Sequence, residues 1–408
     1  MRNLLVLGVL TFFGHEIDAA EPVLMKKGLV VHEWGVFRVS DDVDFANAYL
    51  RAEWDDLPAF AYGHIKGRVV PQHWGAFEER LRPIIFFHAD TPTQVRVKVD
   101  FPGGMAGVWF PATEKPVVEG QQKQPKFGSA LEWNLAIKQP GMSWQPKSPA
   151  PPEVSDKHWI SRIRRVKSDE IFARYGPRPT DVEREKFIYY DGIFPHQKWM
   201  KIAVEKDRVT LASQVKHPVF DVTVVDRRSE KVRVGRIAKM EAGETIKEVS
   251  FAEATASGFA SEATETLVKQ LVGAGLFEDE AQALADDWKQ RMFETPGIHL
   301  FYRMPREAYD RSMPLTVTPV PESVVRVGLI FHGHLEPDFP DRILELVKQL
   351  DAPKFAERNA AMKKLQAIGP AALAQIQKLR VRKDLSVEVR ERIDALIKKW
   401  SAMEAFDK

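Results

Sequence analysis

The hydrophobic positions of residues 277–337 change their period twice within a short distance. Over 284–292 an apolar residue recurs at every fourth position, which is the period of a helix with one buried face. From 298 to 304 the period falls to two, which predicts a strand, and a second alternating row over 325–331 predicts another. A helix followed by strands is therefore expected here.

The preceding part of the chain shows mainly strand patterns. Short alternating or wholly apolar runs are separated by turn residues, a spacing typical of an antiparallel sandwich. The run 185–194 is expected to end in an Asp-Gly turn, and 262–275 has the period of an amphipathic helix. The expected strands are 29–39, 83–88, 95–101, 131–137, and 219–225 paired with 231–236.

The pattern changes again near residue 340. Four short apolar-periodic segments with tight turns predict two antiparallel helical hairpins. The segments FAERNAAMKKLQAIGPAAL and SVEVRERIDALI resemble a HEAT-type helical repeat, and this resemblance implies a packing or protein-contact module without chemistry of its own. The expected fold class is α+β. We expect a mostly antiparallel β-sandwich-like body with packed helices over 21–337, followed by a small all-α module over 338–408. Within the body, 21–240 is mostly strands, and 241–337 contains helices and closing strands.

The first 20 residues have the pattern of a secretory signal peptide. A basic residue precedes an apolar run that is too short to span a bilayer comfortably, and no later segment is long enough for a transmembrane helix. The chain of 408 residues has a formal net charge of +2 and no cysteine, which excludes disulfides, thiolate metal sites and cysteine nucleophiles. We therefore expect an exported protein, periplasmic or extracellular.

Several blocks of the body resemble one family. VHEWGVF, VKVDFPGG, EKFIYYDG and FYRMPREAYDRSMPLTVTPVPESVVRVGL are similar to those of a family of exported bacterial proteins of uncharacterised function. The resemblance implies export and shared ancestry, and it carries no catalytic residues over to this chain.

Histidines suggest a metal site. His332 and His334 lie two positions apart on an expected strand, so both imidazoles should point to one side and reach one divalent ion such as Zn²⁺. Glu336 and the His32–Glu33 pair are possible further ligands, and Glu33 could instead be a base for a metal-bound water. The alternative is that the His-Gly-His motif simply ends a strand.

Two other candidate sites rest on residue type alone. Tyr190, Asp191 and Arg303 could perform acid–base chemistry, although an Asp–Arg ion pair is more often structural. Flat tryptophan faces could stack on a polysaccharide, although aromatic residues more often lie in a core. The tryptophans considered for this role are Trp34, Trp54 and Trp74.

These patterns leave two hypotheses for the function. The first is a non-catalytic binding or scaffolding protein of the cell envelope, with the C-terminal helices contacting envelope proteins. The alternative is a metal-dependent hydrolase that uses the histidines. The basic, aromatic run 159–167 fits either a solvated edge strand or nucleic-acid binding, but export argues against a nucleic-acid partner.

Overall fold

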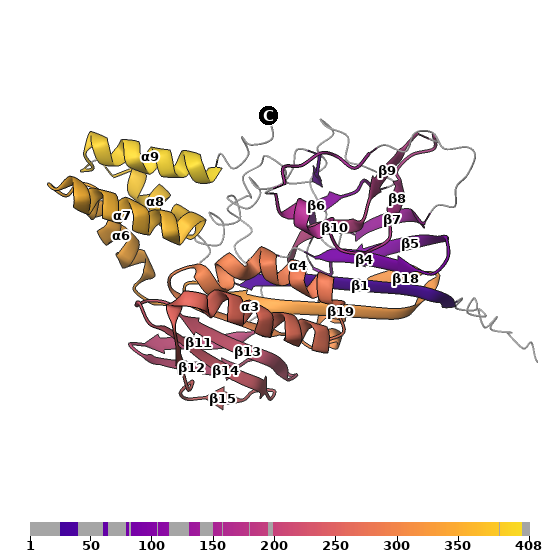
Figure 1. The fold of residues 1–408 in the computed structure, drawn as a ribbon, viewed down its shortest axis with the longest axis horizontal. Helices are drawn as coiled ribbons and strands as arrows, with labels where there is room; N and C mark the ends of the chain where they lie inside the picture. Colours follow the sequence, from indigo (N-terminus) through magenta and orange to yellow (C-terminus); the bar gives the residue numbers. More distant parts are fainter. Residues whose placement is uncertain are drawn as a thin grey trace, which may run out of the picture.

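The computed structural model of the protein describes residues 25–39, 60–63, 79–80, 83–103, 105–113, 130–138, 150–156, 158–178, 180–194, 199–382 and 384–401. The fold is mixed α+β, with large sheets and a helical C-terminal part (Figure 1). The expected fold class is confirmed. The signal-like segment 1–20 lies outside the described residues.

The main sheet is built around one long parallel pair. Strand β1 (Met25–Val39) lies beside β19 (Val320–His332), with Glu33 opposite Arg326 and Val39 opposite His332. Every other strand pair among the described residues is antiparallel, so the sheet is mixed at its centre. The sheet has the order β16-β14-β13-β17-β19-β1-β3-β10-β6-β2, with β4 paired to β1 and β10. Its other strands are β2 (Tyr62–Gly63), β3 (Glu79–Arg80), β4 (Ile84–Ala89), β6 (Met105–Phe110), β10 (Phe187–Phe194), β13 (Val219–Asp226), β14 (Val232–Met240), β16 (Ala252–Ala254) and β17 (Ile298–Arg303).

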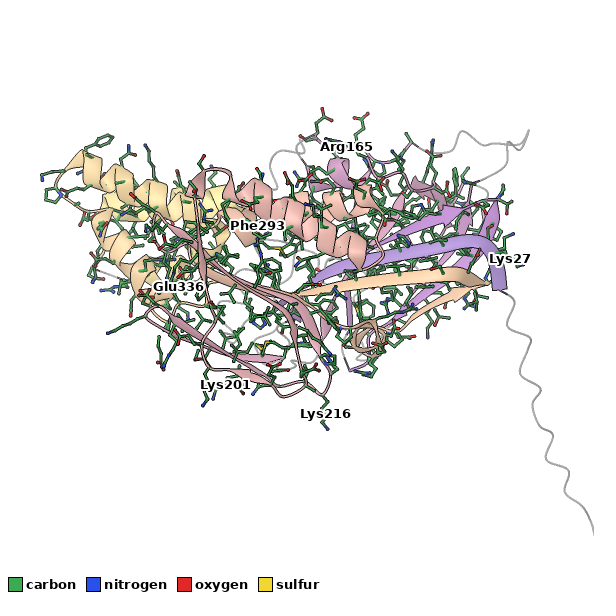
Figure 2. The ribbon with its side chains drawn as sticks, turned by 60° about the horizontal axis from the view of Figure 1, so that its bottom comes forward. Lys27, Arg165, Lys201, Lys216, Phe293 and Glu336 are labelled. Atoms are coloured by element: carbon green, nitrogen blue, oxygen red, sulfur yellow. The ribbon has the colours of Figure 1, made fainter. Side chains whose placement is uncertain are left out.

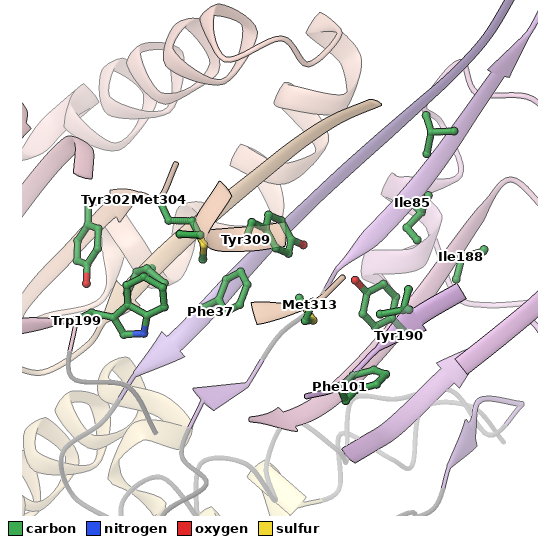
Figure 3. Close-up of a cluster of buried hydrophobic side chains, with 14 of the residues drawn as sticks. Phe37, Ile85, Phe101, Ile188, Tyr190, Trp199, Tyr302, Met304, Tyr309 and Met313 are labelled. Carbon is green, nitrogen blue, oxygen red and sulfur yellow. The ribbon is translucent and has the colours of Figure 1, made fainter. Parts of the chain in front are cut away.

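Two smaller sheets pack on one face of the main sheet. The five-stranded sheet has the order β18-β5-β7-β8-β9, and the three-stranded sheet has the order β11-β12-β15. Alternate apolar residues of β5, such as Val95 and Val97, join Val31 and Phe37 of β1 in one hydrophobic core. Figure 3 shows Phe37 among the side chains of this core. This is a sandwich-like arrangement. The strands are β5 (Thr93–Asp100), β7 (Ala130–Ile137), β8 (Ile171–Arg174), β9 (Val182–Glu185), β11 (Met200–Glu205), β12 (Arg208–Ser213), β15 (Thr245–Ile246) and β18 (Leu315–Thr318).

Helices cover the opposite face of the main sheet. Helices α3 (Ala256–Gly273) and α4 (Glu278–Lys289) lie across the central strands (Figure 1), and a π-helical turn, Gln290–Glu294, extends α4. Leu284 and Trp288 of α4 pack with Trp34 of β1 in a second core. The central strands are thus buried on both faces, and their alternate residues enter two different cores.

The C-terminal module has its own core. Its helices are α6 (Phe339–Gln349), α7 (Phe355–Ile368), α8 (Leu373–Arg380) and α9 (Val387–Ser401), and their buried side chains form a third cluster. The expected pair of helical hairpins is confirmed. Within the described residues, no helix is long and apolar enough to cross a membrane.

Two local expectations are wrong. Strand β10 continues through Asp191 and Gly192, where its register against β6 shifts, so the Asp-Gly pair marks an irregularity and not a turn. Within 159–167, Trp159–Ile163 forms the short helix α2, whose side chains Trp159, Ile160 and Ile163 are buried. Side-chain burial against the sheet therefore replaces the expected edge strand. The short helix α5 (Arg306–Ser312) connects β17 to β18.

Candidate functional site

Strand β1 sends neighbouring polar side chains into opposite cores. Trp34 and Val36 belong to the core under the helices, whereas Val31 and Phe37 belong to the core between the sheets. Because side chains alternate along a strand, His32 faces the helices and Glu33 faces the smaller sheets. The two residues therefore cannot serve one metal ion together, contrary to the sequence hypothesis.

Glu33 lies at the centre of a buried hydrogen-bonded network. Tyr190 donates its hydroxyl to Oε1 of Glu33, and Tyr309 donates to the same oxygen at 3.0 Å. The Nε of Arg326, the residue opposite Glu33 on β19, donates to Oε2 at 2.5 Å. Figure 3 shows Tyr190 and Tyr309 among the buried side chains of this core. Three donors from three elements therefore hold one carboxylate.

Arg326 links this network to the edge of the core. Its Nη1 donates to Asp310 Oδ1 at 2.7 Å and to the carbonyl of Met313 at 2.8 Å, and its guanidinium lies 4.1 Å from the centre of the Tyr309 ring. Burial, together with the negative charge of Glu33, raises the pKa of Tyr190 and of Tyr309 well above 10. Both tyrosines are therefore neutral hydrogen-bond donors at neutral pH.

The solvent exposure of this network decides its role. Glu33, Tyr190 and Tyr309 are completely buried, and the side chain of Arg326 is 1% exposed. The pair is out of water, and its polar atoms are hydrogen-bonded except Nη2 of Arg326, which is buried without a partner among the described residues. Loss of either charge would leave the other uncompensated in the core, so the pair favours one arrangement of the chain. We therefore interpret the network as a cross-link between β1, β10, α5 and β19.

His32 belongs to a second polar cluster, on the helix side of the sheet. Its Nδ1 lies 2.7 Å from Oε2 of Glu280, and Nε2 of His88 lies 2.9 Å from Oε1 of the same carboxylate. His88 stands on β4, which pairs with β1, and Glu280 stands in the first turn of α4. Among the described residues, this is the group of three whose nitrogen and oxygen atoms could hold a metal ion, all within 4.8 Å of one another.

The surroundings of Glu280 keep its carboxylate ionised. Burial alone would raise the pKa of Glu280, but hydrogen bonds with His32, His88 and the backbone N–H of Phe277 outweigh it and lower the pKa. The Phe277 ring packs against both imidazoles, with ring centres 4.5 Å from His32 and 4.7 Å from His88. Phe277 therefore covers part of the outer side of the cluster, while the side chain of His88 remains 19% exposed.

Sequence reasoning named His32 but missed His88 and Glu280. His88 is the last residue of an apolar run, and Glu280 is one of three acidic residues at the start of α4, where carboxylates are common because they favour the helix dipole. Neither the apolar run that ends at His88 nor the acidic start of α4 indicates that His88 and Glu280 lie close together. Only strand pairing and helix packing bring the three residues together.

The structure separates the expected histidine ligands. His332 lies opposite Val39, whereas His32 lies opposite Val325, seven residues earlier on β19, so they are about 23 Å apart along the strand. His332 stacks against Tyr302, a residue of the core between the sheets, whereas His334 packs edge-on against His299 on the helix side. The shared-face prediction is wrong because β19 ends at His332, and His334, at φ +55°, turns the chain.

Glu336 serves as an acceptor where the body joins the helical module (Figure 2). It accepts hydrogen bonds at 2.8 Å from the N–H of Ile298 and from Nη2 of Arg342, and its Oε1 lies 3.7 Å from Nδ1 of His334. Burial would raise its pKa, but His334, the N–H of Ile298 and the charge of Arg342 lower the pKa to about 2. Burial lowers the pKa of His332 to about 3. These groups fit a structural junction and, among the described residues, do not form a three-ligand metal group with His332.

The other candidates are also separated. Arg303 pairs with Asp221, Nε to Oδ2 at 2.8 Å, and not with Asp191, while Tyr190 belongs to the Glu33 network. Trp34 is buried in the core under the helices and offers no face to a sugar. Trp54 and Trp74 lie outside the described residues. The acid–base trio is therefore not assembled.

Comparisons with known proteins add no family or fold. No protein-family model, curated protein or solved structure matches this chain. The candidate sites therefore rest on their own geometry.

Proposed function

We propose that this protein is an exported binding or scaffolding protein of the cell envelope and that its helical module, residues 338–408, binds the partner protein. The observation that carries the proposal is a group of exposed apolar side chains on the helical module. Phe355 is 66% exposed, Val381 81% and Val387 73%. They are the most exposed of the large hydrophobic residues in the part of the chain that the structure describes.

Contacts within the module place these three residues at one end. Phe355 begins α7 after the α6–α7 turn, while Val381 and Val387 flank the α8–α9 turn. The two turns are joined by Ser386 Oγ donating to Asp351 Oδ1 at 2.8 Å and by the 3.2 Å ion pair of Arg358 with Glu388. Figure 1 shows this end pointing away from the sheets. We call Phe355, Val381 and Val387 the apolar end of the module.

The charge of the module suggests the chemistry of the partner. Residues 338–408 contain 15 Lys and Arg against 11 Asp and Glu, an excess of four positive charges, although the whole chain has a net charge of only +2. A positive surface favours association with a negative one, and apolar anchors favour a recess that removes them from water. We therefore expect an acidic envelope protein with an apolar recess.

The test changes only the apolar end in the full-length chain. The variant Phe355→Ser, Val381→Ser, Val387→Ser is compared with Val272→Ser, Val320→Ser, which alters exposed apolar residues of the body. Each protein is used to capture partners from an envelope fraction at low and at raised salt. We expect the first variant to lose one defined acidic protein by at least about 30-fold. The control should retain it, and raised salt should weaken the capture.

Two outcomes would contradict this proposal. One is a full set of partners retained by the triple variant. The other is binding of the wild-type chain to vesicles of anionic lipid that the triple variant loses, because the apolar end would then serve a membrane surface and not a protein.

Export and the family resemblance belong to the same proposal. Export rests on the first 20 residues and on the quoted blocks, and the family resemblance rests on the blocks alone. Recovery of the full-length chain in the cytosol with its first 20 residues intact would contradict an envelope role. In the hydrolase alternative, His332, His334 and Glu336 share one metal ion with His32. This alternative has no such support because the structure separates His332 from His32 along the sheet.

A further inference from the structure

We propose that His32, His88 and Glu280 form a binding site for one late first-row divalent transition metal ion, with Zn²⁺ the ion that fits best. Two imidazole nitrogens and one carboxylate oxygen are the donors that such ions take in proteins. This site is on the body of the protein, and it is independent of the partner surface proposed for the helical module.

The three donor groups already lie in mutual contact, close to the spacing of metal ligands. Ligand atoms about 2.0–2.1 Å from a tetrahedral Zn²⁺ are about 3.3 Å from one another. In the structure, Glu280 lies 2.7 Å from His32 and 2.9 Å from His88, and all three donor atoms fit within 4.8 Å. The two close pairs would have to open by about half an ångström and the widest pair to close by up to about 1.5 Å, which are side-chain movements that leave the backbone in place.

The charge of Glu280 gives an independent reason. This carboxylate is completely buried, and its partners among the described residues are the two histidines and the N–H of Phe277, none of which is a permanent cation. Buried charges are normally paired or bind metal ions. A divalent cation between the imidazoles would place a permanent positive charge beside this carboxylate.

The helix terminus does not argue against a cation. The N-terminal end of a helix carries a partial positive charge, which would repel a metal ion. The first turn of α4 contains three carboxylates, Glu278, Asp279 and Glu280, and these offset that charge. The local field is therefore compatible with a bound cation.

The three ligands come from rigid and separate elements. His32 and His88 stand on paired strands, and Glu280 stands on the helix that covers them. An ion bound by all three would tie α4 to the main sheet. Three protein ligands also leave one position of a tetrahedral ion for water. The ion can enter from the side of His88, whose side chain is 19% exposed, beside the half-exposed ring of Phe277.

The test measures metal binding directly in the full-length protein. Metal-free protein is dialysed against Zn²⁺ alone, the bound metal is counted by elemental analysis, and the affinity is measured by calorimetry. We expect one ion per chain. Loss of a residue that only contacts a metal ligand commonly weakens metal binding by about 10–100-fold. His88→Gln removes a ligand itself, so the affinity for Zn²⁺ should fall by more than about 100-fold. The matched control is His217→Gln, a partly buried histidine far from the cluster in sequence.

A second measurement covers variants that fold poorly. Zn²⁺ should raise the thermal unfolding temperature of the wild type and of His217→Gln, because a ligand that binds the folded state stabilises it. The shift should be absent in His88→Gln and in Glu280→Gln. His88 is at the accessible side of the site, so His88→Gln is the variant expected to keep the native near-ultraviolet circular dichroism.

The proposal is overturned by either of two results. Wild-type protein that binds less than one equivalent of Zn²⁺ and shows no thermal shift has no such site. A natively folded His88→Gln variant with wild-type affinity would place the ion elsewhere. Neither result affects the proposed partner of the helical module, because that test changes other residues and needs no metal.

Discussion

Replacing Glu33 by Gln tests whether the buried network is a structural cross-link. Glutamine has nearly the same shape, and its carbonyl oxygen can still accept from Tyr190 and Tyr309. Its NH₂ group, however, would face the donating Nε of Arg326, which now lies 2.5 Å from the carboxylate. The change therefore removes one negative charge and places two donors opposite each other in a fully buried site.

The expected loss follows from the burial of the pair. Removing one partner of a buried ion pair commonly costs about 3–5 kcal/mol, because the remaining charge stays in the core. Asp310 still accepts from Arg326 and is partly exposed, so we expect the lower end, about 3 kcal/mol. Tyr190→Phe removes one neutral donor and should cost about 1–2 kcal/mol. Glu33→Gln should therefore be clearly the more damaging change.

The free energy of unfolding is measured by urea titration at neutral pH, with tryptophan fluorescence as the signal. Trp133, whose ring lies 6.3 Å from that of Tyr190, reports on this core. Glu230→Gln, at an exposed position, is the control and should change stability by less than about 0.5 kcal/mol. The double variant Glu33→Gln, Arg326→Met should recover part of the loss, because no unpaired buried charge remains and the glutamine carbonyl still accepts from both tyrosines.

One result would refute this reasoning. If Glu33→Gln unfolds at the same urea concentration as the wild type, the carboxylate does not stabilise the core, and its burial would need a functional explanation.

Three further predictions concern pH and backbone conformation. His332 has a folded-state pKa of about 3, below its ordinary value, so the free energy of unfolding should fall as pH drops below about 6.5. The expected loss is about 2 kcal/mol at pH 5. In urea titrations, His332→Phe should flatten this dependence of stability on pH. Tyr190 and Tyr309 have raised pKa values, so their contribution is present below pH 10 and lost above it; phenolate absorbance should show both ionising only with alkaline unfolding, and earlier ionisation in folded protein would contradict this. Gly297→Ala should cost about 1–3 kcal/mol by thermal unfolding, since φ is +133° and the new Cβ would lie 2.7 Å from a buried carboxylate oxygen; Gly243→Ala, at φ +71° with open space around it, should cost less.

Local periodicity predicted the elements because each depends on residues close in sequence. The helix around Trp288, the strand of Tyr302 and the four C-terminal helices were all predicted from spacings of two to four residues. The failures were also local. Asp191 and Gly192 have the composition of a turn, but pairing of β10 with strands on both sides keeps the chain extended there.

The sequence by itself determined the strand and helix pattern, the α+β class and the separate helical module. It also places His32 and Glu33 next to each other, which suggests a single site. Only the tertiary structure decided that they face different cores and have different partners, Glu280 for one and Arg326 for the other. The reason is physical: the pairing of β1 with β19 joins residues 293 positions apart, and no local pattern encodes its register. A register shift of one residue would exchange the faces of His32 and Glu33. The packing of the whole sheet sets the register.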